Sequence, residues 1–98
     1  MKIVQWFDSS EARSFAKELA TFITSELSGK LASREQFKAK AGKTLVQAAR
    51  RLQDFQATHR LNFLTRSRLA NAFLWALKDS GCPEDYANEL TEWLTIRL

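Results

Sequence analysis

Apolar residues recur every three to four positions along most of the chain, which is the spacing of an amphipathic α-helix. The first segment with this spacing carries Phe15, Leu19, Phe22, Ile23 and Leu27 on one face. Asp8-Ser9-Ser10-Glu11 precedes it with the spacing of a capping box, in which a short polar side chain and a glutamate satisfy free N–H groups at a helix start. Gly29 follows where a left-handed C-terminal cap is expected. These signals predict a helix over residues 9–28.

A second stretch carries the same periodicity over a longer part of the chain. Its apolar positions, at steps of four and three, are Phe37, Ala41, Leu45, Ala48, Leu52, Phe55 and His59. Ser33-Arg34-Glu35-Gln36 supplies another capping-box pattern directly before them. The periodicity continues through Gly42, and it therefore predicts one helix over residues 34–59, although glycine inside a helix costs about 1 kcal/mol relative to alanine. His59 shares the apolar stripe, so we interpret it as a residue of the helix end rather than a ligand or base.

Two further apolar patterns follow. Asn62 and Thr65 both suit the N-cap of a third helix, and Gly81 marks its end. The apolar face of this helix comprises Leu69, Ala70, Phe73, Leu74, Trp75, Ala76 and Leu77. Because that face is wide, we expect the third helix to be the most buried. Pro83 suits the first turn of a fourth helix, predicted over residues 83–97.

The four segments together predict an all-α fold. Short connections favour antiparallel neighbours, and both a four-helix bundle and an irregular four-helix array satisfy the pattern. Residues 3–7 are apolar and β-prone, but no other segment reads as a strand to pair with them, so we expect a short extended N-terminal lead-in. No repeat or linker divides the chain, and residues 1–98 are interpreted as a single helical domain.

Composition is consistent with a folded helical protein and indicates the cellular compartment in which it is expected. Hydrophobic residues make up 45% of the 98 residues, which is enough to close a core. Cys82 is the only cysteine, so an intramolecular disulfide is excluded and a reducing compartment is favoured. No signal peptide is evident, and the longest apolar run, Ala72 to Leu77, is six residues, far below the roughly 20 that span a bilayer. We therefore expect a cytoplasmic protein without a membrane span.

Charge is distributed unevenly along the chain, and the distribution is more informative than the net charge of +4. Residues 30–68 contain ten basic and two acidic residues, whereas the flanking segments carry a small excess of acidic residues. A basic surface attracts phosphates or acidic proteins, but an acidic last helix can also lie against a basic second one inside a bundle. The sequence leaves both interpretations open.

In a continuous second helix, basic side chains gather on the side away from the apolar face. At about 100° per residue, five polar side chains fall within roughly 100° of arc. This basic stripe, the candidate binding site, consists of Lys40, Lys43, Gln47, Arg50 and Arg51. Such a stripe suits a phosphate backbone, because each neutralised phosphate releases counterions. The alternative is an ordinary solvated helix face, since Asp54 falls within the same arc.

The residues around Gly42 also share features with two binding motifs. Gly42-Lys43-Thr44 matches the end of a phosphate-binding loop, but the glycine required five residues earlier is Phe37, and no strand precedes it. Phe37 to Gly42 has features of a helix-turn-helix, in which the helix after the turn enters the major groove. Lys43 stands where that motif needs an apolar residue, so one continuous helix is the favoured interpretation.

Signals for catalysis or metal binding are weak. The acidic side chains of the fourth helix are Glu84, Asp85, Glu89 and Glu92. They are interpreted as helix-capping and solvent-facing charges rather than as an acid–base pair. One histidine and one cysteine do not make a nucleophile with its base or a metal site. We therefore expect no enzyme activity, no cofactor, no metal and no small-molecule substrate.

The aromatic residues leave a choice between core and partner surface. Five large aromatic residues can exceed the capacity of so small a core: Trp6, Phe7, Phe63, Trp75 and Trp93. Left outside, they would form an apolar patch of the kind that marks a binding surface. The sequence thus favours a small intracellular helical protein that binds another macromolecule, either a protein partner or further copies of itself. The alternative is a nucleic-acid-binding protein that uses the basic segment 30–68.

Overall fold

The computed structural model describes residues 10–29 and 33–98, and within these ranges it contains four α-helices and no strand. The helices are α2 (Ser10–Glu26), α3 (Arg34–Thr58), α4 (Phe63–Asp79) and α5 (Glu84–Arg97). The predicted all-α four-helix fold is confirmed. The predicted lead-in at residues 3–7 and the cap at Asp8 and Ser9 lie outside the described residues. No helix in the described part of the chain combines the length and apolar character needed to cross a membrane.

Local capping explains where most of the helices begin and end. The Ser33 side chain accepts a hydrogen bond from the N–H of Gln36, and Asn62 accepts one from the N–H of Thr65 at 2.8 Å. Asn62 is therefore the cap of α4, and Thr65 lies inside the helix. Pro83 occupies the N-cap position of α5, one residue before the helix begins. Gly29 and Gly81 follow α2 and α4 with φ of +81° and +88°, as left-handed C-terminal caps require.

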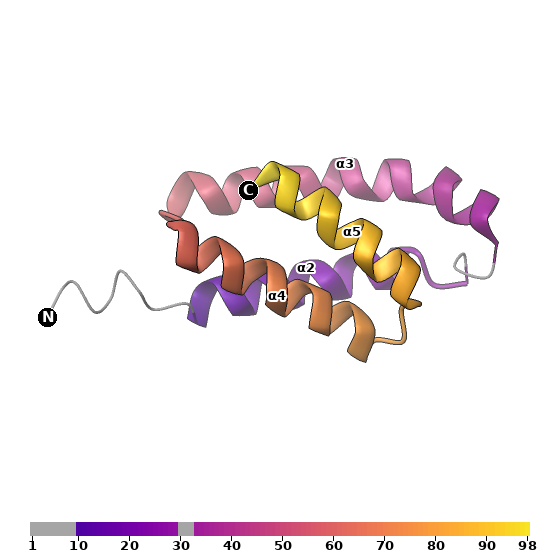
Figure 1. Ribbon diagram of the computed structural model, residues 1–98. Coiled ribbons are helices and arrows are strands. Elements are labelled where there is room, and N and C mark those ends of the chain that lie inside the picture. The colour runs from indigo at the N-terminus through magenta and orange to yellow at the C-terminus, as the bar shows by residue number, and fades with distance from the viewer. Residues whose placement is uncertain (1–9, 30–32) are drawn as a thin grey trace, which may run out of the picture.

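The helices form an elongated array rather than a symmetric bundle. Figure 1 shows α3 along one side, α2 and α4 along the other, and α5 slanting between them. Successive helices run in opposite directions, so the start of α4 and the end of α5 lie toward the same end of the molecule (Figure 1). The short connections predicted from the sequence produce this alternation.

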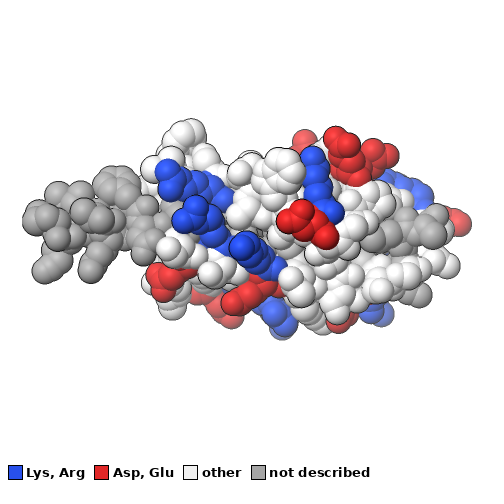
Figure 2. Space-filling view, turned by 90° about the horizontal axis from the view of Figure 1, so that it is seen from below, with Lys and Arg blue, Asp and Glu red and all other residues white. Residues whose placement is uncertain are grey.

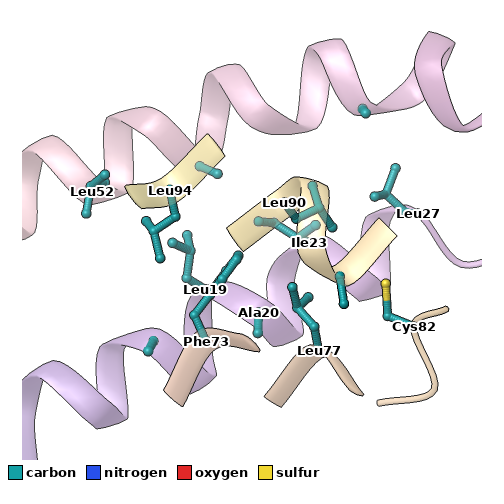
Figure 3. Close-up of a cluster of buried hydrophobic side chains, with 14 of the residues drawn as sticks. Leu19, Ala20, Ile23, Leu27, Leu52, Phe73, Leu77, Cys82, Leu90 and Leu94 are labelled. Carbon is teal, nitrogen blue, oxygen red and sulfur yellow. The ribbon is translucent and has the colours of Figure 1, made fainter. Parts of the chain in front are cut away.

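The core lies where α2, α4 and α5 meet. Figure 3 shows Leu19 of α2, Phe73 of α4 and Leu94 of α5 pointing toward one another, and all three are at most 1% exposed. Helix α2 presents Ala16 and Ala20 to this core, and both are fully buried. Small side chains allow two helix axes to approach closely, and α2 and α4 have the most extensive backbone contact of any helix pair.

Helix α3 is joined to the rest of the molecule by large side chains. Its backbone stays more than 8 Å from that of α5 at every Cα pair. Stacked rings bridge the space: Phe37 lies 4.1 Å from Tyr86 of α5, and Phe55 lies 4.3 Å from Phe15 of α2, measured between ring centres. Phe55 also stacks on His59, at 4.2 Å. The interpretation of His59 as a helix-end residue agrees with this geometry.

Helix α4 is not the most buried helix, and that prediction is wrong. Its apolar face is wider than the area its two neighbours, α2 and α5, can cover. Trp75 is consequently 55% exposed, and Phe63 and Leu64 in the first turn are 84% and 41% exposed. More residues are buried in α2, which is of equal length. Part of the broad apolar face that the sequence predicts for this helix is therefore exposed.

Gly42 lies inside the continuous helix α3, and we predict that Gly42→Ala stabilises the fold. A Cβ atom built at Gly42 meets nothing within 4 Å. Alanine is better than glycine in a helix interior by roughly 0.5–1 kcal/mol, so the free energy of unfolding should rise by about that amount. Urea unfolding followed by circular dichroism measures the change.

The matched control is Gly81→Ala. A Cβ atom also finds open space there, but φ is +88°, a conformation that alanine adopts only with strain. This variant should be destabilised. Two variants that shift the urea midpoint in the same direction would show that helix propensity at Gly42 is not the controlling factor.

Candidate functional site

The structure divides the basic stripe between two environments. Lys40 and Arg51 lie along α2: Lys40 Nζ is 3.7 Å from a carboxylate oxygen of Glu26, and the Arg51 guanidinium carbon is 3.9 Å from the centre of the Phe22 ring. The other three stripe residues, Lys43, Gln47 and Arg50, are exposed and form no hydrogen bond or ion pair with any residue in 10–29 or 33–98. The open part of the stripe is therefore shorter than the sequence pattern indicates.

Helix α3 runs through Gly42 without a turn. The helix-turn-helix alternative is therefore wrong, because it needs a break between two helices at this glycine. The phosphate-loop alternative also fails, since Thr44 of Gly42-Lys43-Thr44 is buried in the helix at 2% exposure. Any role of the basic stripe must be that of one straight helix face.

The acidic last helix does not cover the basic stripe. Its polar contacts with α3 are the ion pair between Arg34 and Glu89 and a 3.5 Å hydrogen bond from Gln56 to the carbonyl oxygen of Arg97. Neither Arg34 nor Gln56 belongs to the stripe. Helix α5 consequently leaves Lys43, Gln47 and Arg50 uncovered.

Arg34 and Glu89 form a well-oriented surface pair beside the Phe37–Tyr86 stack. Two guanidinium N–H groups donate to the two carboxylate oxygens, at 2.5 and 2.8 Å, and Arg34 also lies 5.2 Å from the Tyr86 ring centre. The hydrogen bonds from Arg34 lower the pKa of Glu89, and the same bonds raise the pKa of Arg34. The pair links α3 to α5 at the surface and favours the charged form of Glu89, which does not suit a proton-transfer role.

A hollow of about 360 Å³ lies between α3 and α5, next to the open part of the stripe. Its lining residues are Gly42, Leu45, Val46, Ala49, Arg50, Gln53, Trp93 and Arg97. Arg97 is already engaged there, because its guanidinium lies 4.6 Å from the Trp93 ring centre and donates to the Trp93 carbonyl oxygen at 3.2 Å. Sequence reasoning missed the proximity of Arg97 and Trp93 to Arg50, and no periodicity links residues so far apart in the chain.

A second, more apolar groove of about 510 Å³ lies between α4 and α5. We call it the α4/α5 groove, and its lining residues are Phe63, Arg66, Ser67, Ala70, Asn71, Leu74, Thr91, Thr95 and Leu98. Arg66 is the one charged side chain in this lining. Phe63 belongs to the lining and is nevertheless 84% exposed, so its ring projects from the groove rather than filling it.

Metal-binding groups do not gather among the described residues. No group of three or more histidine, cysteine, aspartate or glutamate residues in that part of the chain could hold a metal ion. Cys82 is buried, and burial raises the pKa of its thiol, which disfavours the reactive thiolate. His59 follows α3 and Cys82 follows α4, so the 17 residues of α4, about 25 Å of helix, separate them.

Side chains of both charges are exposed on the face of the molecule seen in Figure 2. Figure 2 shows Lys and Arg side chains beside Asp and Glu side chains on the face seen from below, where Figure 1 places α2 and α4. That face therefore offers no continuous field of one sign.

Compared with known proteins, the chain matches no protein-family model, no curated protein and no solved structure. The geometry of its own surfaces is what supports a function.

Proposed function

We propose that this protein is a helical protein-binding module whose binding surface is the α4/α5 groove. The observation that carries the proposal is the position of Phe63, an aromatic ring that is 84% exposed at the rim of an apolar groove. Burying an exposed aromatic ring against a partner contributes much of the energy of a typical interface. Arg66 beside it adds a side chain of the type enriched at protein interfaces.

The groove has the anatomy of a protein-binding surface rather than of an enzyme pocket. Ala70, Leu74 and Leu98 give it an apolar interior, and serine, threonine and asparagine side chains surround them. An apolar centre with a polar edge is the common arrangement at protein interfaces. An enzyme site would need convergent titratable groups, and Arg66 is the one such group in this lining.

Nucleic-acid binding through the basic stripe is the second candidate. It is favoured by the exposed stripe residues Lys43, Gln47 and Arg50, which α5 leaves uncovered and which pair with no residue in the part of the chain that the structure describes. Two unpaired cations give a small electrostatic contribution, since affinity for nucleic acid grows with the number of phosphates neutralised. The protein-binding proposal is therefore the better supported of the two.

The test is the effect of Phe63→Ser on direct protein binding. Proteins retained by the tagged chain from a nuclease-treated extract are identified, purified and titrated calorimetrically against wild-type and variant protein. We expect at least one to bind directly and to lose at least tenfold in affinity with Phe63→Ser, because truncation of an interface hot spot costs about 2 kcal/mol or more.

Trp75→Ser is the matched control, since Trp75 is a second exposed aromatic of α4 that lies outside the groove lining. It should leave the affinity unchanged. Equal affinities for wild type and Phe63→Ser would exclude the α4/α5 groove as the site. Retention that disappears with nuclease treatment and with neutralised Lys43 and Arg50 would favour the nucleic-acid candidate instead.

A further inference from the structure

The α4/α5 groove carries a projection and a recess side by side on one surface. Phe63 projects at its rim, while the small side chain of Ala70 and the partly covered Leu74 and Leu98 line it. A surface that offers both parts can bind its own copy, each copy inserting a projection into the recess of the other. This self-complementarity is the requirement for a two-fold symmetric dimer.

The direction of the two helices fixes how such copies would meet. Helices α4 and α5 run in opposite directions, and Phe63 at the start of α4 and Leu98 after the end of α5 line the same groove. A two-fold axis along the groove places α4 of one copy over α5 of the other and keeps these ends level. Each Phe63 then faces the part of the opposite groove formed by Thr95 and Leu98.

One charged side chain in the groove and one beside it fit the same symmetry. Arg66 lies on α4, one turn after Phe63, and Glu92 lies on α5, next to Thr91 and one turn before Thr95. Both side chains are exposed, and neither forms an ion pair with a residue of the described chain. When α4 of one copy lies over α5 of the other, Arg66 approaches Glu92 of the opposite copy, and the two Arg66 side chains stay on opposite sides of the axis.

We infer that the partner bound in the α4/α5 groove is a second copy of this chain, held by reciprocal insertion of Phe63 and by pairing of Arg66 with Glu92 across the two-fold axis. This inference rests on the proposed function, because it names the occupant of the same groove. An interface confined to this groove of about 510 Å³ is small, so the dimer is expected to form in reversible equilibrium with the monomer.

Sedimentation equilibrium of the purified chain between about 1 µM and about 1 mM measures the association, since weak protein interfaces dissociate in this range. Wild-type protein should change from monomer to dimer with increasing concentration. Phe63→Ser should raise the dimer dissociation constant at least tenfold. Trp75→Ser should leave it unchanged, because Trp75 is exposed on α4 outside the groove lining.

A charge-exchange series tests the orientation of the two copies. Arg66→Glu and Glu92→Arg should each weaken the dimer, because each places like charges opposite one another across the axis. The double variant Arg66→Glu/Glu92→Arg restores opposite charges and should recover most of the wild-type affinity. Both positions are exposed, so folding of all three variants is checked simply by circular dichroism.

The outcomes separate this inference from the proposed function. Wild-type protein that stays monomeric up to about 1 mM, while a different protein binds in a Phe63-dependent manner, would overturn the dimer and leave the binding module standing. A dimer that Phe63→Ser does not weaken would place the self-association on another surface and overturn this inference, while the titration of other proteins against Phe63→Ser still decides the proposed function. A Phe63-dependent dimer without recovery in the double variant would overturn the proposed pairing of Arg66 with Glu92.

Discussion

Phe73→Ala is expected to lower the free energy of unfolding by about 3–5 kcal/mol, the range for a buried phenylalanine truncated to alanine. Phe73 is fully buried and is among the largest side chains of the core. Figure 3 shows it pointing from α4 toward Leu19 of α2 and Leu94 of α5, so its removal leaves a cavity between three helices. Typical domains unfold at a cost of about 5–15 kcal/mol, and this variant should therefore lose a large part of its stability.

Urea unfolding measures this loss, and Trp75→Ala provides the control on the same helix. Trp75 has the larger ring, but it is 55% exposed and makes its principal polar contact with Lys78, 5.1 Å from the ring centre. Its truncation should shift the midpoint only slightly. A similar loss in both variants would mean that the exposed side of α4 is covered in solution, as in a stable oligomer.

The helices were predictable from the sequence because their signals are local. The Ser33 and Asn62 caps, the left-handed glycines after α2 and α4, and the unbroken periodicity through Gly42 each depend on a few neighbouring residues. Which apolar residues are covered depends instead on where the neighbouring helices lie around each face. Helix α4 packs against α2 and α5, and Phe63 and Trp75, which the pattern alone cannot distinguish from core residues, lie outside the area that these two helices cover.

The basic stripe illustrates the same limit at the candidate site. Periodicity correctly placed its five residues on one side of α3, because helical geometry alone determines that arc. It could not show that Glu26 and Phe22 of α2 would engage two of them, Lys40 and Arg51. The α4/α5 groove was missed for a related reason, since its walls come from separate helices and no spacing in the sequence relates them.

The sequence left open whether the acidic last helix pairs with the basic second helix. The structure shows which residues of the two helices form an ion pair. Glu89 of α5 pairs with Arg34, at the beginning of α3 and outside the stripe. The net charges of the two segments therefore indicated that the helices attract one another, but they did not identify the residues that pair. An interaction that depends on two side chains 55 positions apart is fixed by packing, not by composition.

Phe37→Ala is expected to lower the free energy of unfolding by about 3 kcal/mol, at the lower end of the range for buried phenylalanines, and to loosen the first half of α3. Phe37 is 5% exposed and stacks on Tyr86 at 4.1 Å, where no Cα atom of α3 lies within 8 Å of a Cα atom of α5. Loss of this ring removes the main apolar bridge between them. Amide hydrogen exchange should become faster in the first turns of α3, with a much smaller change in α4.

The matched variant Arg34→Gln separates the ring stack from the ion pair beside it. Because Arg34 lowers the pKa of Glu89, the pair stabilises the fold at a pH above the usual glutamate value of about 4.3, and this contribution is lost as the pH falls through the lowered pKa. The effect of Arg34→Gln should accordingly be small at neutral pH, as for exposed pairs, and vanish in acid. The effect of Phe37→Ala should persist at both pH values. If Arg34→Gln accelerates exchange in α3 as much as Phe37→Ala does, then the ion pair, and not the stacked rings, holds this helix in place.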